Sequence, residues 1–148
     1  MGKTLIQIKD TIKTIANNHR QINYFGDEQV WYAETSGTVN YPTFWAVYME
    51  TELRKGEKGY QFEFYALDLI RNDRSNIGDI YNDMDMVMTD VIASLEWGGD
   101  ADIDLKVESF RYEKVDEPFN DDVVAGHKCR VVVWTDFNLN ECIIPTIT

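Results

Sequence analysis

A long periodic run of apolar residues after Asn76 constrains the fold of this chain most strongly. Its members recur at spacings of three and four residues: Ile77, Ile80, Met84, Val87, Val91 and Leu95. This spacing places them on one face of an α-helix of about five turns. Asn76 can cap the first turn, where Asp79 also suits the helix dipole, and the glycines after Trp97 provide a stop. The sequence therefore predicts a long amphipathic helix that must pack against another layer.

A second helix is predicted near the N-terminus, over residues 4–18. Its apolar residues also recur at spacings of three and four, and they are Leu5, Ile8, Ile12 and Ile15. The polar residues between them, such as Lys9 and Lys13, give this segment an outer face. We therefore expect this helix to bury one stripe against the rest of the domain.

The remaining segments favour strands. Residues 43–53 and 60–70 are rich in aromatic and β-branched residues, and the glycine-containing segment 54–59 between them predicts a hairpin. One or two strands with a loop are expected within residues 21–40. Residues 103–115 predict a strand with a phase slip between Val107 and Phe110, a pattern typical of a bulge. A polar loop over 116–122 and a last strand over 127–135 complete the pattern.

Both strands of the predicted hairpin are apolar on both faces. Trp45 and Val47 alternate with Phe44 and Ala46 instead of with polar residues. An antiparallel sheet with one solvated face shows polar residues at every second position. We therefore expect the second face to be covered, either by the helices or by a neighbouring subunit.

These elements predict one α+β domain over residues 1–148, with an antiparallel or mixed sheet, an N-terminal helix and one long central helix. The hydrophobic fraction of 44% suits a single core. Apolar runs such as residues 131–134 are far shorter than the roughly 20 residues that cross a bilayer, so no membrane contact is expected. Cys129 and Cys142 form no CxxC pair, and free thiols favour synthesis in a reducing cytoplasm.

Charge is unevenly distributed along the chain. The formal net charge is -12, and residues 61–148 hold nineteen acids against seven bases, whereas residues 1–60 hold seven of each. Tight binding to nucleic acid needs clustered lysine and arginine, so this function is disfavoured. The excess acid is either a solvated face that aids solubility or a surface past which nucleic acid slides without adhering.

No pattern in the sequence favours an enzyme. His127 and Cys129 share one face of a predicted strand, but no orienting group or oxyanion site accompanies them, and core histidine and cysteine are far commoner. We therefore expect no catalytic residues and no cofactor.

A metal site is not expected either. Asp100, Asp102 and Asp104 have the opening spacing of a calcium loop. The sixth position of that loop is Leu105 instead of glycine, and the twelfth is Arg111 instead of glutamate. The cysteines and histidines also lack the paired spacing of a zinc site.

Two stretches of the chain resemble neck and tail-completion proteins of tailed bacteriophages. The first is LDLIRNDRSNIGDI at residues 67–80, which leads into the helix segment YNDMDMVMTDVI at 81–92. The second combines Gly126 before an apolar strand with DFNLNECIIP at 136–145, and it is similar to such proteins in large gut phages of the crAss-like group. The order of elements matches the tail-terminator type, an α+β protomer that closes into a ring. The resemblance implies a structural virion protein in the neck or tail and brings no catalytic residues with it.

In such a ring, six- or twelvefold, the partners would be further copies of the chain and the neighbouring portal, neck or tail proteins, with genomic DNA passing through without specific binding. We hypothesise that acidic residues line or face that passage: Asp79, Asp83, Asp85, Asp90, Asp100, Asp102 and Asp104. The basic hairpin tip is a candidate for docking to the adjacent ring, through Arg54, Lys55, Gly56, Glu57, Lys58 and Gly59.

Two alternatives stay open. The chain could form an adaptor or a tube-like ring at another position in the same stack. It could also be a small acidic interaction protein, either an immunity protein or a nucleic-acid mimic that blocks a basic partner. The number of subunits separates these classes, because an inhibitor binds one partner as a monomer or dimer.

Overall fold

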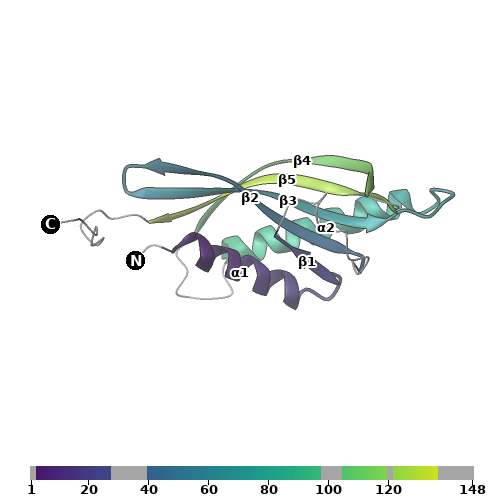
Figure 1. Ribbon diagram of the computed structural model, residues 1–148, viewed down its shortest axis with the longest axis horizontal. Helices are drawn as coiled ribbons and strands as arrows, with labels where there is room; N and C mark the ends of the chain where they lie inside the picture. The colour runs from purple at the N-terminus through teal and green to yellow at the C-terminus, as the bar shows by residue number, and fades with distance from the viewer. Residues whose placement is uncertain (1–2, 28–39, 98–104, 120–121, 137–148) are drawn as a thin grey trace.

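Two helices lie along one face of a mixed sheet in the computed structural model (Figure 1). The structure describes residues 3–27, 40–97, 105–119 and 122–136. Within these residues the elements are α1 (Leu5–Asn18), β1 (Tyr24–Gly26), β2 (Thr43–Arg54), β3 (Glu57–Leu69), α2 (Ile77–Trp97), β4 (Lys106–Phe119) and β5 (Asp122–Asp136). The predicted α+β class, with an N-terminal and a long central helix, is confirmed.

Helix α1 begins where its sequence provides a capping box. The Thr4 side chain accepts a hydrogen bond from the backbone N–H of Gln7, and the Gln7 side chain accepts one from the backbone N–H of Thr4. The predicted apolar stripe faces the core, and Ile8, Ile12 and Ala16 are buried. The helix therefore matches the prediction closely.

Helix α2 has the predicted bounds, but Asn76 has a different role from the one expected. Its side chain accepts a hydrogen bond from Arg71 N at 2.9 Å and donates one to Leu69 O at 3.2 Å. These bonds close the connection between β3 and α2, and the structure shows no bond from the Asn76 side chain to the first turn of the helix. Asn76 thus fixes where the helix starts by folding back the preceding loop.

The five strands are arranged in the order β1-β2-β3-β5-β4. Strand β1 runs parallel to β2 and pairs only with Thr43–Trp45, whereas all other neighbours are antiparallel. The hairpin turn is tighter than predicted. Arg54 pairs with Glu57, which leaves Lys55 and Gly56 as the turn, and Gly56 adopts a left-handed φ of 80° that favours glycine.

The prediction of a polar loop over residues 116–122 is wrong. Strand β4 continues to Phe119, and its pairing with β5 extends to Asp122. Backbone pairing in a ladder does not require apolar side chains, so an edge hairpin can extend through polar residues. The predicted bulge is present, but its register shift lies between Ser109 and Tyr112. Of the region 21–40, the structure describes β1, and residues 28–39 lie outside the described part.

The two faces of the sheet are covered differently. Both helices pack on one face, over a core that includes Phe44, Phe62 and Phe64. On the opposite face Trp45 is fully buried at one end, in a cluster that the chain's own tyrosines cover, namely Tyr24, Tyr41 and Tyr65. Among the described residues no helix covers this face, and its middle part carries charged residues such as Glu63, Lys128 and Arg130. We call it the open face.

Candidate functional site

The outer side of α2 carries the acidic residues that were singled out from the sequence. Asp79, Asp83, Asp85 and Asp90 are all exposed. The 3.6-residue period places Asp79, Asp83 and Asp90 along one stripe that also contains Met86, which is 55% exposed. Asp90 accepts a hydrogen bond at 2.9 Å from His19, the residue that follows α1. The other three acidic candidates, Asp100, Asp102 and Asp104, lie outside the described residues.

Asp85 lies on a different side of the helix. Burial is the main cause that raises the pKa of the Tyr112 hydroxyl on β4, and the negative charge of Asp85 adds to it. That hydroxyl is hydrogen-bonded to Thr89 at 2.9 Å. Asp85 therefore belongs to the flank of α2 that faces β4, apart from the stripe.

The β2–β3 hairpin extends past the ends of the helices (Figure 1). Arg54 stacks on the Trp134 ring at 4.1 Å and is hydrogen-bonded to Glu52 at 3.2 Å. Because Glu52 and Glu57 flank the basic residues, the tip carries both signs of charge and is not simply basic. Met49 and Leu53 are exposed by 52% and 64%, so this end of β2 also presents apolar surface.

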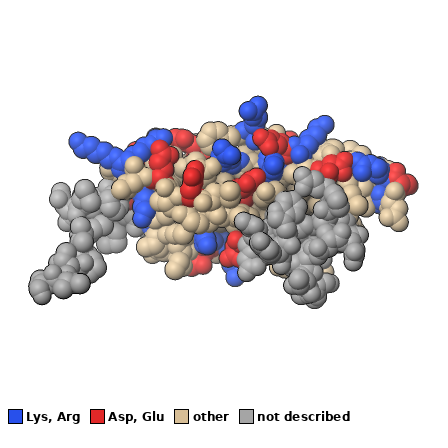
Figure 2. All heavy atoms as spheres, turned by 45° about the horizontal axis from the view of Figure 1, so that its top comes forward, with Lys and Arg blue, Asp and Glu red and all other residues tan. Residues whose placement is uncertain are grey.

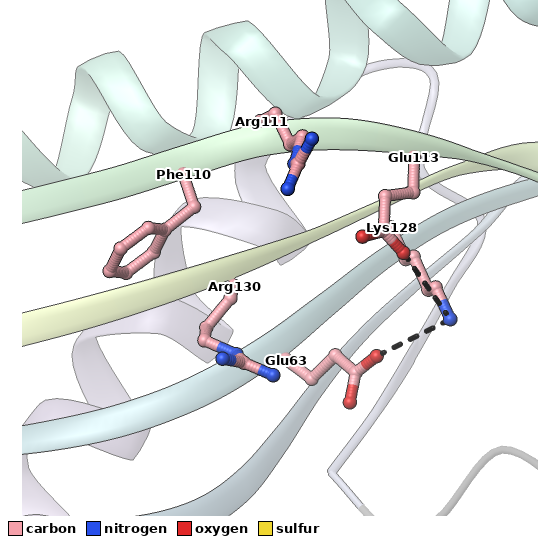
Figure 3. Close-up of a pocket in the computed structure, with 6 residues that line it drawn as sticks. All are labelled: Glu63, Phe110, Arg111, Glu113, Lys128 and Arg130. Carbon is pink, nitrogen blue, oxygen red and sulfur yellow. Dashed lines mark ion pairs between the residues drawn. The ribbon is translucent and has the colours of Figure 1, made fainter.

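The open face contains a hollow of about 310 Å³ that sequence reasoning missed (Figure 3). It lies over β3, β4 and β5 and is lined by Glu63, Phe110, Arg111, Glu113, Lys128 and Arg130. Lys128 Nζ lies 3.9 Å from Glu63 Oε1 and 3.7 Å from Glu113 Oε2, so its charge is balanced by two carboxylates. Arg111 and Arg130 add two further positive charges, so the residues that line the hollow carry a net charge of +1.

The position of Arg130 in this hollow is fixed by a chain of hydrogen bonds. With the amide of Gln61 oriented so that its oxygen faces Arg130, that oxygen accepts a bond from Arg130 Nε at 2.9 Å, and the amide nitrogen donates to Glu50 Oε1 at 2.7 Å. Figure 2 shows lysine and arginine interspersed with aspartate and glutamate on the side of the molecule that it presents.

His127 and Cys129 both have structural partners in the core. His127 Nε2 lies 2.8 Å from the carbonyl oxygen of Tyr81, and the Cys129 thiol donates to the carbonyl oxygen of Phe110 at 3.3 Å. Burial raises the pKa of the Cys129 thiol, which favours the protonated form. An activated nucleophile needs the opposite shift, so this pair carries no sign of nucleophilic chemistry.

Within the described ranges, no group of three or more histidine, cysteine, aspartate or glutamate residues is placed to hold a metal ion. In the same part of the chain, no helix is both long and apolar enough to span a bilayer. Neither a protein-family model nor a curated protein matches the sequence.

Proposed function

We propose that this chain is a structural virion protein that forms a six- or twelvefold ring in the head-to-tail connection of a tailed phage. In this role it joins the portal or an adaptor to the tail and surrounds the passage for genomic DNA. The α+β architecture and the order of elements support the proposal, because they agree with the type of protomer that the sequence resembles. The protein would be made in the host cytoplasm and assembled into the neck or tail.

The observation that carries this proposal is the extended end of the β2–β3 hairpin. Its exposed Met49 and Leu53 lie on a strand whose outer edge has no partner strand in the described residues after Trp45. Fully burying such a side chain is worth about 1.5–3 kcal/mol. A neighbouring ring that seats this end would gain part of that free energy and would also pair the open strand edge.

The charge of the chain suits a wall along which DNA moves. A net charge of -12 offers few cations to the phosphates, so counterion release cannot drive adhesion. The same property favours the second candidate, a small acidic inhibitor, and the exposed acidic stripe of α2 is its specific support. The inhibitor would be a monomer or dimer with one basic partner.

The number of subunits decides between the two. The purified full chain would be measured by size-exclusion chromatography with light scattering, and large species would be imaged in negative stain. A closed ring with a central hole supports the neck proposal. A monomer or dimer that persists at every protein concentration contradicts a self-assembling ring and favours the inhibitor.

The docking role of the hairpin has its own test in the phage. The variant Met49→Glu/Leu53→Glu should lower the yield of tailed particles at least about tenfold, because two charges replace the apolar surface. Val123→Glu is the control for one such charge, since Val123 is also exposed but lies at the opposite end of the sheet. An unchanged yield with the hairpin variant would remove the docking role and leave the ring itself in place.

A further inference from the structure

The acidic stripe of α2 and the hollow on the open face lie on opposite sides of the molecule and have complementary properties. We propose that Asp79, Asp83 and Met86 of one copy dock into the hollow around Arg111 and Arg130 of the next copy. This inference rests on the proposed ring and identifies the contact between its subunits. The occupant of the hollow is therefore a second copy of this chain.

The arginines in the hollow are placed to receive carboxylates. Gln61 engages only Nε of Arg130, and no described residue bonds the terminal nitrogens of Arg130 or the guanidinium of Arg111. A guanidinium with free terminal nitrogens can bind a carboxylate through two parallel hydrogen bonds. Because Lys128 is already paired with Glu63 and Glu113, the two arginines supply the attraction.

The bulge in β4 creates this arrangement. At the register shift between Ser109 and Tyr112, two residues of β4, Phe110 and Arg111, lie opposite the single residue Arg130 of β5. Bulges commonly redirect side chains in this way next to functional sites. Phe110 remains 53% exposed as a result, so an apolar ring lies at the rim beside the guanidinium groups.

The distance between the aspartates on α2 is similar to the distance between the strands that carry the two arginines. Residues four apart on a helix, such as Asp79 and Asp83, lie about 6 Å from each other. Neighbouring strands lie about 4.8 Å apart, and Arg111 and Arg130 belong to the neighbouring strands β4 and β5. Met86 follows on the same stripe, where its thioether can contact an aromatic ring such as that of Phe110.

Such a contact joins two different surfaces and is therefore heterologous. Repeating it head to tail produces a ring when the rotation between copies closes, and the helices of one copy then cover the open sheet face of the next. This arrangement moves Asp79 and Asp83 from the proposed passage wall to the subunit contact. A place on the passage wall predicts that variants of Asp79 and Asp83 keep the ring, whereas a place in the subunit contact predicts that they lose it.

Charge reversal tests the contact on the full-length protein. Arg111→Glu/Arg130→Glu and Asp79→Arg/Asp83→Arg should each reduce the mass measured by light scattering from that of the ring to that of the monomer. Combining all four substitutions should restore the ring, because the charges are exchanged across the contact. The matched control for the aspartate reversal is Asp10→Arg/Asp85→Arg, which changes the net charge by the same amount at exposed positions outside the stripe and should keep the ring.

The outcomes separate this inference from the proposed function. A wild-type chain that forms no ring counts against both. If the wild type forms a ring and both charge-reversed variants still form it, the contact alone is overturned. The contact is also overturned if the variant with all four substitutions stays monomeric while its circular dichroism matches that of the wild type. Loss of the ring in both reversals, with recovery in the combined variant, supports the contact and excludes misfolding as the cause of the loss.

Discussion

Gly126 is the position where the structure makes its sharpest prediction about stability. It lies in β5 opposite Leu67 of β3, in the central part of the sheet. A Cβ atom added at this position would come within 1.9 Å of the backbone carbonyl oxygen of Ala66 and 2.9 Å of its carbonyl carbon. We therefore choose Gly126→Ala as the perturbation.

The expected loss of stability depends on which atoms must move to make room for the added Cβ atom. The obstructing atoms belong to backbone in a paired strand, so no side-chain rotation relieves the clash. Separating the strands locally would weaken about two ladder hydrogen bonds at roughly 1 kcal/mol each. Forcing a methyl group into a packed interior adds about 1–3 kcal/mol. We expect Gly126→Ala to lower the free energy of unfolding by about 3–5 kcal/mol.

Urea unfolding followed by circular dichroism measures this loss. The control is Gly78→Ala, because Gly78 lies in the first turn of α2 and a Cβ there meets no atom within 4 Å. That variant should be stabilised by up to about 1 kcal/mol, since alanine is the better helix former. A loss below about 1 kcal/mol for Gly126→Ala would show that β3 and β5 do not approach each other as described.

Three further predictions concern other parts of the fold. Thr4→Ala should lower the free energy of unfolding by about 1 kcal/mol in the same assay, because it removes the capping box of α1. In a Cys142→Ser background, Cys129 should react with a thiol reagent at least about 100-fold more slowly in the native protein than in urea. The reason is that the buried thiol reacts only after a local opening of the fold, which costs at least about 2.7 kcal/mol. Equal rates would contradict the burial of this thiol. Burial raises the pKa of the Asp68 carboxyl, so the folded protein binds the proton of this group more tightly than the unfolded chain does. Stability is therefore lost as the pH rises from the ordinary aspartate pKa of the unfolded chain to the raised pKa of the folded protein. Asp68→Asn should therefore raise the urea midpoint at pH 7, and this gain should shrink as the pH falls towards about 3.9; a gain that is constant with pH would refute the cause.

The helices and the hairpin are determined by local sequence. The three- and four-residue spacing after Asn76 and after Thr4 is enough to predict α2 and α1, because a helix places such positions on one face whatever surrounds it. Gly56 between two aromatic-rich strands likewise predicts the hairpin. The phase slip before Phe110 indicates the bulge, because an extra residue interrupts the two-residue period of a strand.

Tertiary structure decides where the strands end and how the faces are covered. Backbone pairing extends β4 and β5 through residues whose polarity predicts a loop, and it shortens the hairpin turn to Lys55 and Gly56. The requirement for glycine at position 126 comes from the approach of Ala66, a residue of another strand. These features depend on pairing partners that are distant along the chain, so no local pattern contains them.

One part of the candidate site can be predicted from the sequence, and the other part is formed only by the tertiary structure. The acidic stripe of α2 is visible in the sequence because its residues recur along one helix. The hollow on the open face is not visible, because Glu63, Arg111 and Arg130 come from three strands that only the order β3-β5-β4 brings together. Sequence alone thus determines the elements and the charge of this protein, whereas the sheet topology decides which of those charges face each other.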